Sequence, residues 1–176
     1  LSPDKSGLPI ALIIIAAGII GTLLIGGMLA DRLSKKDPRW LPSIAAIGAL
    51  VMSAGAIGIA LAPSIGWLWI AFSFVAVGST TYLAPSLALS QSLSPIELRA
   101  TSGALALMIA NLFGLGLGAP IIGMVSDLVE QQLGNGSLAA AMLLVPIMGV
   151  WAAFHYGRCA AFLPKSDPSS RETLAA

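Results

Sequence analysis

The chain has 176 residues, of which 57% are hydrophobic and 10% are charged, and its mean hydropathy is +0.91. Soluble globular domains carry about 25% charged residues, so this chain has too few polar side chains to cover a soluble fold. The lipid bilayer is therefore the expected solvent for most of its surface. The net charge of +1 argues against a strongly basic binding surface, so we expect no nucleic-acid partner.

The chemistry-bearing residues are sparse. The sequence has one cysteine, Cys159, and one histidine, His155, which excludes an internal disulfide and a cysteine zinc cage. Membrane-embedded enzymes need paired carboxylates, histidine clusters or an activated nucleophile, and no such constellation is present. We therefore expect no cofactor, no metal and no enzymatic activity, with a membrane-embedded enzyme as the weakest alternative.

The charged residues fall into tight clusters separated by long uncharged stretches. About 25 uncharged residues lie between Lys5 and Asp31, and about 27 follow each of Arg99 and Glu130. Each stretch is long enough for one membrane-spanning helix, which needs about 20 apolar residues. The stretch after Arg39 has about 57 uncharged residues and predicts two helices.

A turn-type cluster, Pro63-Ser64-Ile65-Gly66, lies near the middle of that long stretch, and Trp67 follows it as an interfacial aromatic residue. The sequence therefore predicts an all-α integral membrane fold without strands. Its five helices are expected at residues 8–30, 40–62, 67–89, 100–125 and 138–163, within one bundle at residues 1–163. Residues 164–176 are expected to form a disordered cytoplasmic tail.

Basic residues predict the orientation of the bundle. The first and third loops and the tail alternate onto one side, and they carry eight basic residues: Arg32, Lys35, Lys36, Arg39, Arg99, Arg158, Lys165 and Arg171. The opposite side carries Lys5 alone. By the positive-inside rule, we expect a multi-pass protein of the cell membrane with its N-terminus outside and its C-terminus in the cytoplasm.

Uncharged polar residues occur inside the predicted helices. Ser79, Tyr82 and Ser86 lie at offsets of three and seven residues and so share one helical face. Asn111 is a further polar residue at depth. Such residues either form hydrogen bonds between helices or line a cavity, and the sequence leaves both open. No Asp, Glu, Lys or Arg lies in the middle of a predicted span, so this chain alone predicts no proton relay.

The first basic loop has a distinctive order of residues, from Gly26 and Gly27 through Asp31 and Arg32 to a pair of lysines. An acidic residue at a helix C-terminus is locally unfavourable. Asp31 therefore predicts a contact with another helix's N-terminus or with an arginine. Such a contact would hold the cytoplasmic side of the protein closed and would break when that side opens. The alternative is a solvated loop.

This loop resembles the glycine-x-leucine-x-aspartate-arginine-x-glycine-basic-basic signature of the major facilitator superfamily, although Ser34 stands where the family usually has glycine. The run from Arg99 through Asn111 to Asp127, with Asp37-Pro38-Arg39-Trp40, is similar to the C-terminal half of spinster-like members. The resemblance covers about residues 8–163. It implies that the chain is a partial C-terminal bundle, the eighth to twelfth of twelve helices.

The resemblance implies a secondary transporter that works by alternating access. Its expected partners are membrane lipid, a small organic or lysolipid-like substrate, and the missing N-terminal half of the same transporter. Proton coupling is a family expectation. The alternative is a non-transporting membrane scaffold or a truncated gene product.

The resemblance also implies roles for individual residues. Those expected to line the substrate cavity are Ser79, Tyr82, Ser86 and Asn111. Those expected to form the gating loop are Asp31, Arg32 and Arg99, because Asp31 would face the missing half and the helix after Arg99 would receive the equivalent acid.

Overall fold

The computed structural model describes residues 3–164, and every regular element within that range is helical. The first predicted helix is one continuous rod that changes its hydrogen-bonding pattern along its length. It consists of α1 (Pro3–Ala17), the π-helical η1 (Gly18–Leu29) and α2 (Ala30–Ser34). The sequence of η1, which is apolar apart from Thr22, gave no signal for π-helical geometry. The predicted tail at residues 164–176 lies outside the described residues except for residue 164.

The second and third helices are α3 (Trp40–Ala60) and α4 (Ile65–Ser92). The predicted turn separates them, and Ser64 caps α4, because its hydroxyl accepts a hydrogen bond from the Trp67 backbone N–H at 3.3 Å. The Trp67 indole N–H donates back across the turn to the Gly58 carbonyl at 3.1 Å. These two bonds fix how α4 leaves α3.

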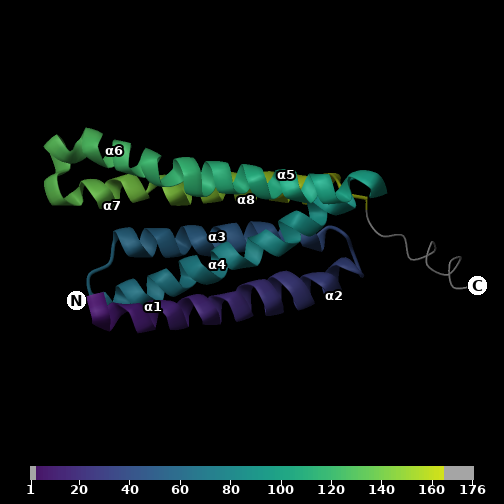
Figure 1. Cartoon of the computed structure of the whole chain (residues 1–176), viewed down its shortest axis with the longest axis horizontal. Coiled ribbons are helices and arrows are strands. Elements are labelled where there is room, and N and C mark those ends of the chain that lie inside the picture. Colours follow the sequence, from purple (N-terminus) through teal and green to yellow (C-terminus); the bar gives the residue numbers. More distant parts are fainter. Residues whose placement is uncertain (1–2, 165–176) are drawn as a thin grey trace, which may run out of the picture.

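The rest of the described chain forms two long arms. The first arm contains the short η2 (Ile96–Leu98), α5 (Arg99–Asn111), the π-helical η3 (Leu112–Leu117) and α6 (Gly118–Leu133). The second arm contains α7 (Ser137–Met142) and α8 (Leu144–Phe162), after the short η4 (Gly134–Gly136). Gly134 has φ +51°, a conformation that glycine adopts readily, and there the chain reverses so that the two arms run antiparallel (Figure 1).

Four helical segments are long and apolar enough to cross a membrane: Ile10–Ser34, Trp40–Ala60, Ile65–Ser92 and Ile96–Phe162. The last has 67 residues, far more than one crossing needs, and it contains both antiparallel arms. The predicted all-α membrane bundle is thereby confirmed.

The two ends of the bundle differ in charge. The α2 end of the first rod, the start of α5 and the end of α8 lie together at one end, on the right of Figure 1. The side chain of Arg39 confirms this placement, because its Nε donates to the Leu163 carbonyl at 2.8 Å. This end, which carries Arg32, Arg39 and Arg99, is called the basic end below.

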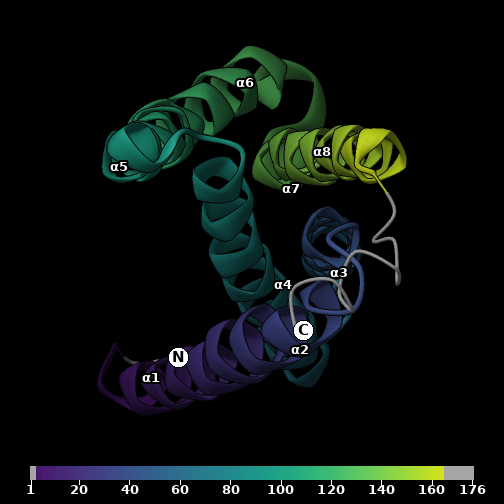
Figure 2. The same cartoon turned by 90° about the vertical axis from the view of Figure 1, so that its right-hand side faces the viewer.

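Helix α4 is central to the arrangement, and it contacts the first rod, α3 and α5 (Figure 2). Small residues allow it to approach α3 closely. A Cβ atom added to Gly78 would lie 2.7 Å from the Gly48 carbonyl oxygen, and one added to Gly55 would lie 2.8 Å from that of Ala71. In lipid, helices associate through such close packing rather than through the hydrophobic effect.

Candidate functional site

Two of the three residues on the predicted polar face of α4, Tyr82 and Ser86, lie next to α8. Ser79, Tyr82 and Ser86 are all half-buried on α4. Pro85 lies beside them inside the helix and is fully buried. The three side chains of the predicted face are therefore partly covered by neighbouring parts of the structure.

Ser86 and Tyr156 join α4 to α8. Their hydroxyl oxygens are 2.7 Å apart, and Ser86 Oγ also donates to the Tyr82 carbonyl at 2.6 Å. A serine hydroxyl has one proton, so the Tyr156 hydroxyl must be the donor to Ser86. The hydrogen-bond chain thus runs from Tyr156 through Ser86 to Tyr82 and leaves the phenolic oxygen of Tyr156 free to accept.

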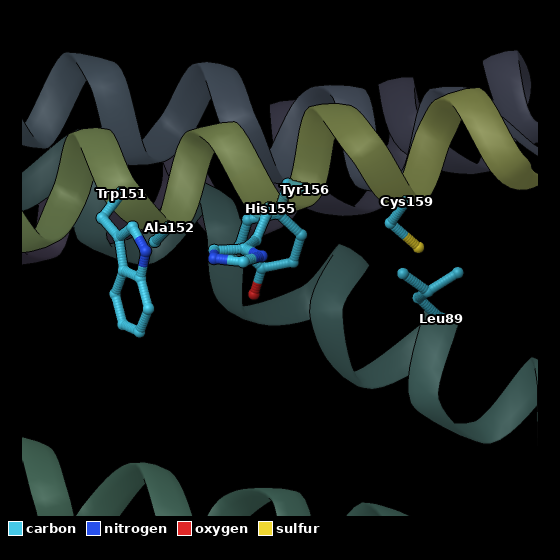
Figure 3. A pocket seen from close by; sticks show the side chains of 6 residues that line it. All are labelled: Leu89, Trp151, Ala152, His155, Tyr156 and Cys159. Carbon is cyan, nitrogen blue, oxygen red and sulfur yellow. The ribbon is translucent and has the colours of Figure 1, made fainter.

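Two cavities meet at Tyr156. The larger, of about 520 Å³, is lined by Leu89 of α4 and by Trp151, Ala152, His155, Tyr156 and Cys159 of α8. In Figure 3 the Trp151, His155 and Tyr156 rings project from α8 on the same side. The smaller, of about 220 Å³, is lined by Ala49, Met52, Tyr82, Met148, Gly149, Ala152 and Tyr156. Tyr82, predicted from its helical face, therefore lines the smaller cavity.

His155 is held between two aromatic rings. Its ring packs edge-on against Trp151, with centroids 5.0 Å apart, and against Phe154 at 5.5 Å. The guanidinium carbon of Arg158 lies 5.9 Å from the Phe154 ring centroid, nearer the basic end. These contacts order the row of aromatic side chains along α8.

The remaining predicted cavity residues bond to their own helices. Ser79 Oγ donates to the Ala76 carbonyl at 2.9 Å, and Asn111 Nδ2 donates to the Leu107 carbonyl at 2.9 Å. Asn111 is exposed on α5 and lines neither cavity at Tyr156. The structure thus groups Tyr82 and Ser86 with Tyr156 and leaves Asn111 apart from them.

The predicted gating residues lie toward the basic end. Asp31 and Arg32 are exposed on α2, where Ser34 Oγ donates to the Asp31 carbonyl at 3.2 Å, and Arg99 is exposed at the first position of α5. A cavity of about 390 Å³ lies beside the start of α5 and is lined by Ser90, Ser94, Leu98, Thr101, Ser102, Leu105, Ala106 and Ile109. Ser102 Oγ donates to the Ser90 carbonyl at 3.1 Å and connects α5 to α4 there.

Sequence reasoning missed Tyr156 and Trp151. Trp151, His155 and Cys159 recur every four residues, and Tyr156 falls on the adjoining part of the same helical face. That spacing was a usable signal for an aromatic face. The sequence did not indicate which helix this face contacts, because its partner Ser86 lies 70 residues away from Tyr156 in the sequence.

Comparison with known proteins identifies a transporter relative. The chain is 40% identical over 132 residues to an MFS-type efflux pump of Mycolicibacterium smegmatis, a match that covers 74% of this chain. The chain spans 30% of the length of that curated relative. No protein-family model matches the sequence, and no solved structure matches it. The chain is thus similar to part of an MFS-type efflux pump, and it has four helical segments that are long and apolar enough to cross a membrane.

Proposed function

We propose that the protein containing this chain is a secondary transporter that moves a small organic or lysolipid-like solute by alternating access. The observation that carries the proposal is the 40% identity to an efflux pump across most of this chain. Its helices correspond to the eighth to twelfth of a spinster-like carrier, and the missing half supplies the facing wall of the cavity. Proton coupling, where it operates, would use a carboxylate outside this chain.

The charge distribution supports an orientation for that carrier. The basic end carries Arg32, Arg39 and Arg99, and Arg39 binds the end of α8 at Leu163. Basic loops remain in the cytoplasm during membrane insertion. The basic end is therefore proposed to be cytoplasmic, with the chain's N-terminus on the outer side.

Two groups of residues take different parts in the proposed cycle. Tyr82 and Ser86 lie inside the bundle on its central helix and are suited to contact a substrate, together with Ser79 and Asn111. Asp31, Arg32 and Arg99 are exposed toward the basic end, where a charged contact with the missing half would close the cytoplasmic side. These residues position the substrate and the two halves, and no bond chemistry is required of them.

Cysteine accessibility tests alternating access without knowledge of the substrate. In the complete protein with all native cysteines replaced by serine, Cys159 included, a single cysteine at Ser79 is exposed to a membrane-impermeant thiol reagent from either face of reconstituted vesicles. Alternating access predicts labelling from both faces, because the cavity opens to each in turn. Labelling from one face only, under all conditions, contradicts the proposal.

Asp31→Asn tests the gating loop in the same assay, and Asp127→Asn is the matched control because Asp127 is an exposed acid in α6, near the opposite end. Loss of the Asp31 charge is expected to raise labelling from the cytoplasmic face, whereas the control leaves the ratio of the two faces unchanged. Equal effects of the two variants would refute the gate.

A further inference from the structure

We propose that the larger cavity at Tyr156 binds a neutral apolar molecule that carries a hydrogen-bond donor, such as an aromatic alcohol. The site consists of Trp151, His155 and Tyr156 of α8 with Leu89 of α4. This inference rests on the proposed function, because it assigns a substrate class to the same carrier. It adds three α8 residues to the binding residues predicted from α4.

The direction of the hydrogen bonds determines which ligand group fits. Ser86 Oγ gives its proton to the Tyr82 carbonyl, so Tyr156 gives its own proton to Ser86. The phenolic oxygen of Tyr156 then has no proton for a ligand and has unused lone pairs. A ligand O–H or N–H group can be accepted there, whereas the Tyr156 hydroxyl has no proton to offer to an ether or carbonyl oxygen.

The size and lining of the cavity determine the rest of the ligand. Its volume of about 520 Å³ lies within the range of about 300–1,000 Å³ that is usual for small-molecule sites. Leu89, Ala152 and the Trp151 ring provide apolar surface, and none of the lining residues is acidic, lysine or arginine. A charged ligand would lose its hydration without gaining an opposite charge, so a neutral molecule is favoured.

The aromatic rings favour a flat, unsaturated ligand. Trp151 is 61% exposed although it lines the cavity, and the edge-on contact at 5.0 Å with His155 fixes the direction of its ring. A ring of the ligand can therefore stack on an indole face that is already oriented, at little entropic cost. Its hydroxyl would point to the Tyr156 oxygen, which also projects from α8 on the side of the Trp151 ring in Figure 3.

The test uses two neutral probes that differ by one donor: naphthol, and its methyl ether. Saturable binding of each is measured to the complete protein in lipid nanodiscs, with empty nanodiscs subtracted to remove partitioning into lipid. We expect naphthol to bind about fivefold more tightly than the ether, the equivalent of about one net hydrogen bond. Equal affinities, or no saturable binding, would overturn the proposal.

Two variants test the direction of the hydrogen bond. Tyr156→Phe keeps the ring and removes the acceptor, so naphthol affinity should fall to that of the ether. Ser86→Ala releases the Tyr156 proton for the ligand, so the affinity for the ether should rise. The preference for naphthol over the ether should then shrink because the ether binds more tightly, not because naphthol binds more weakly. A preference for naphthol that survives Tyr156→Phe would refute the assignment of Tyr156 as the acceptor. The gain expected for Ser86→Ala cannot come from misfolding, because a misfolded protein would lose affinity for both probes.

Trp151→Leu tests the aromatic wall, with Phe154→Leu as its matched control. Both side chains are exposed aromatics of α8 that contact His155, but Trp151 alone of the two lines the cavity. The affinity for both probes should fall with Trp151→Leu and not with Phe154→Leu, and equal losses would count against the site.

The two proposals can fail separately. If the cysteine at Ser79 is labelled from both faces while naphthol does not bind, the ligand site is refuted and the carrier proposal stands. If naphthol binds while that cysteine is labelled from one face only, the carrier proposal is refuted and the binding site stands.

Discussion

The Nε atom of Arg39 donates a hydrogen bond to the carbonyl oxygen of Leu163, with 2.8 Å between the two atoms. Leu163 is the C-cap residue directly after α8, and Arg39 directly precedes α3, so this bond connects the first loop to the end of the last helix. The Asp37 carboxylate accepts from the Arg39 backbone N–H at 3.0 Å and holds the arginine in place. One side chain thus fixes the relative position of two chain segments at the basic end.

Arg39→Ala should therefore loosen the end of α8. The Leu163 carbonyl would lose its charged donor, and a hydrogen bond of this kind contributes about 1 kcal/mol when partly exposed. We expect a lower melting temperature in detergent and faster amide exchange in the last turn of α8. Arg32→Ala removes the same charge from α2 and serves as control. Equal effects of the two variants would show that charge, and not the bond to Leu163, is responsible.

Gly78→Ala should weaken the contact between α3 and α4. An added Cβ would meet the backbone of Met52 and lie 2.7 Å from the Gly48 carbonyl oxygen, and backbone atoms cannot move aside as a flexible side chain can. Overpacking of this kind costs about 1–3 kcal/mol. Gly66→Ala in the same helix is the control, because nothing lies within 4 Å of its added Cβ. Thermal unfolding should show a clear loss for Gly78→Ala alone.

Thr80→Val should weaken the contact between α4 and the first rod. Thr80 Oγ1 donates to the Ala17 carbonyl at 2.9 Å, whereas the neighbouring Thr81 Oγ1 donates to Val77 of its own helix at 2.8 Å. Hydrogen bonds between membrane helices contribute about 0.6 kcal/mol on average. The melting temperature should fall more for Thr80→Val than for Thr81→Val. A larger loss at Thr81 would contradict the assignment of Thr80 as the connecting residue.

The membrane architecture was largely predictable from the sequence, because charge clusters and bilayer-length apolar stretches are local properties. The turn at Pro63–Gly66 was predictable for the same reason, since its residues cap α4 through Ser64. Helical spacing also placed Tyr82 and Ser86 on one face. Spacing, however, identifies a face and not its partner, so the bond from Ser86 to Tyr156 and the cavity beside His155 became visible only in three dimensions.

Two features had no sequence signal at all. The π-helical segments η1 and η3 lie in glycine-rich apolar runs, whose residue pattern does not differ from that of the neighbouring α-helical turns. The interhelical bond of Thr80 was also unexpected, because threonine in a membrane helix usually bonds back to its own backbone. The Thr80 hydroxyl oxygen lies 2.9 Å from the Ala17 carbonyl oxygen and 3.0 Å from that of Ala76, so its one proton is shared between the two helices.

Topology mapping by cysteine labelling tests the five-crossing bundle most directly. In the complete protein with all native cysteines replaced by serine, Cys159 included, single cysteines replace four exposed loop or helix-end residues: Pro38, Leu61, Glu97 and Asn135. An impermeant maleimide added to intact cells should label the cysteines at 61 and 135, and those at 38 and 97 only after the membrane is permeabilised. Labelling of the cysteines at 38 and 61, or of those at 97 and 135, from the same face would contradict the bundle and the carrier assignment that depends on it.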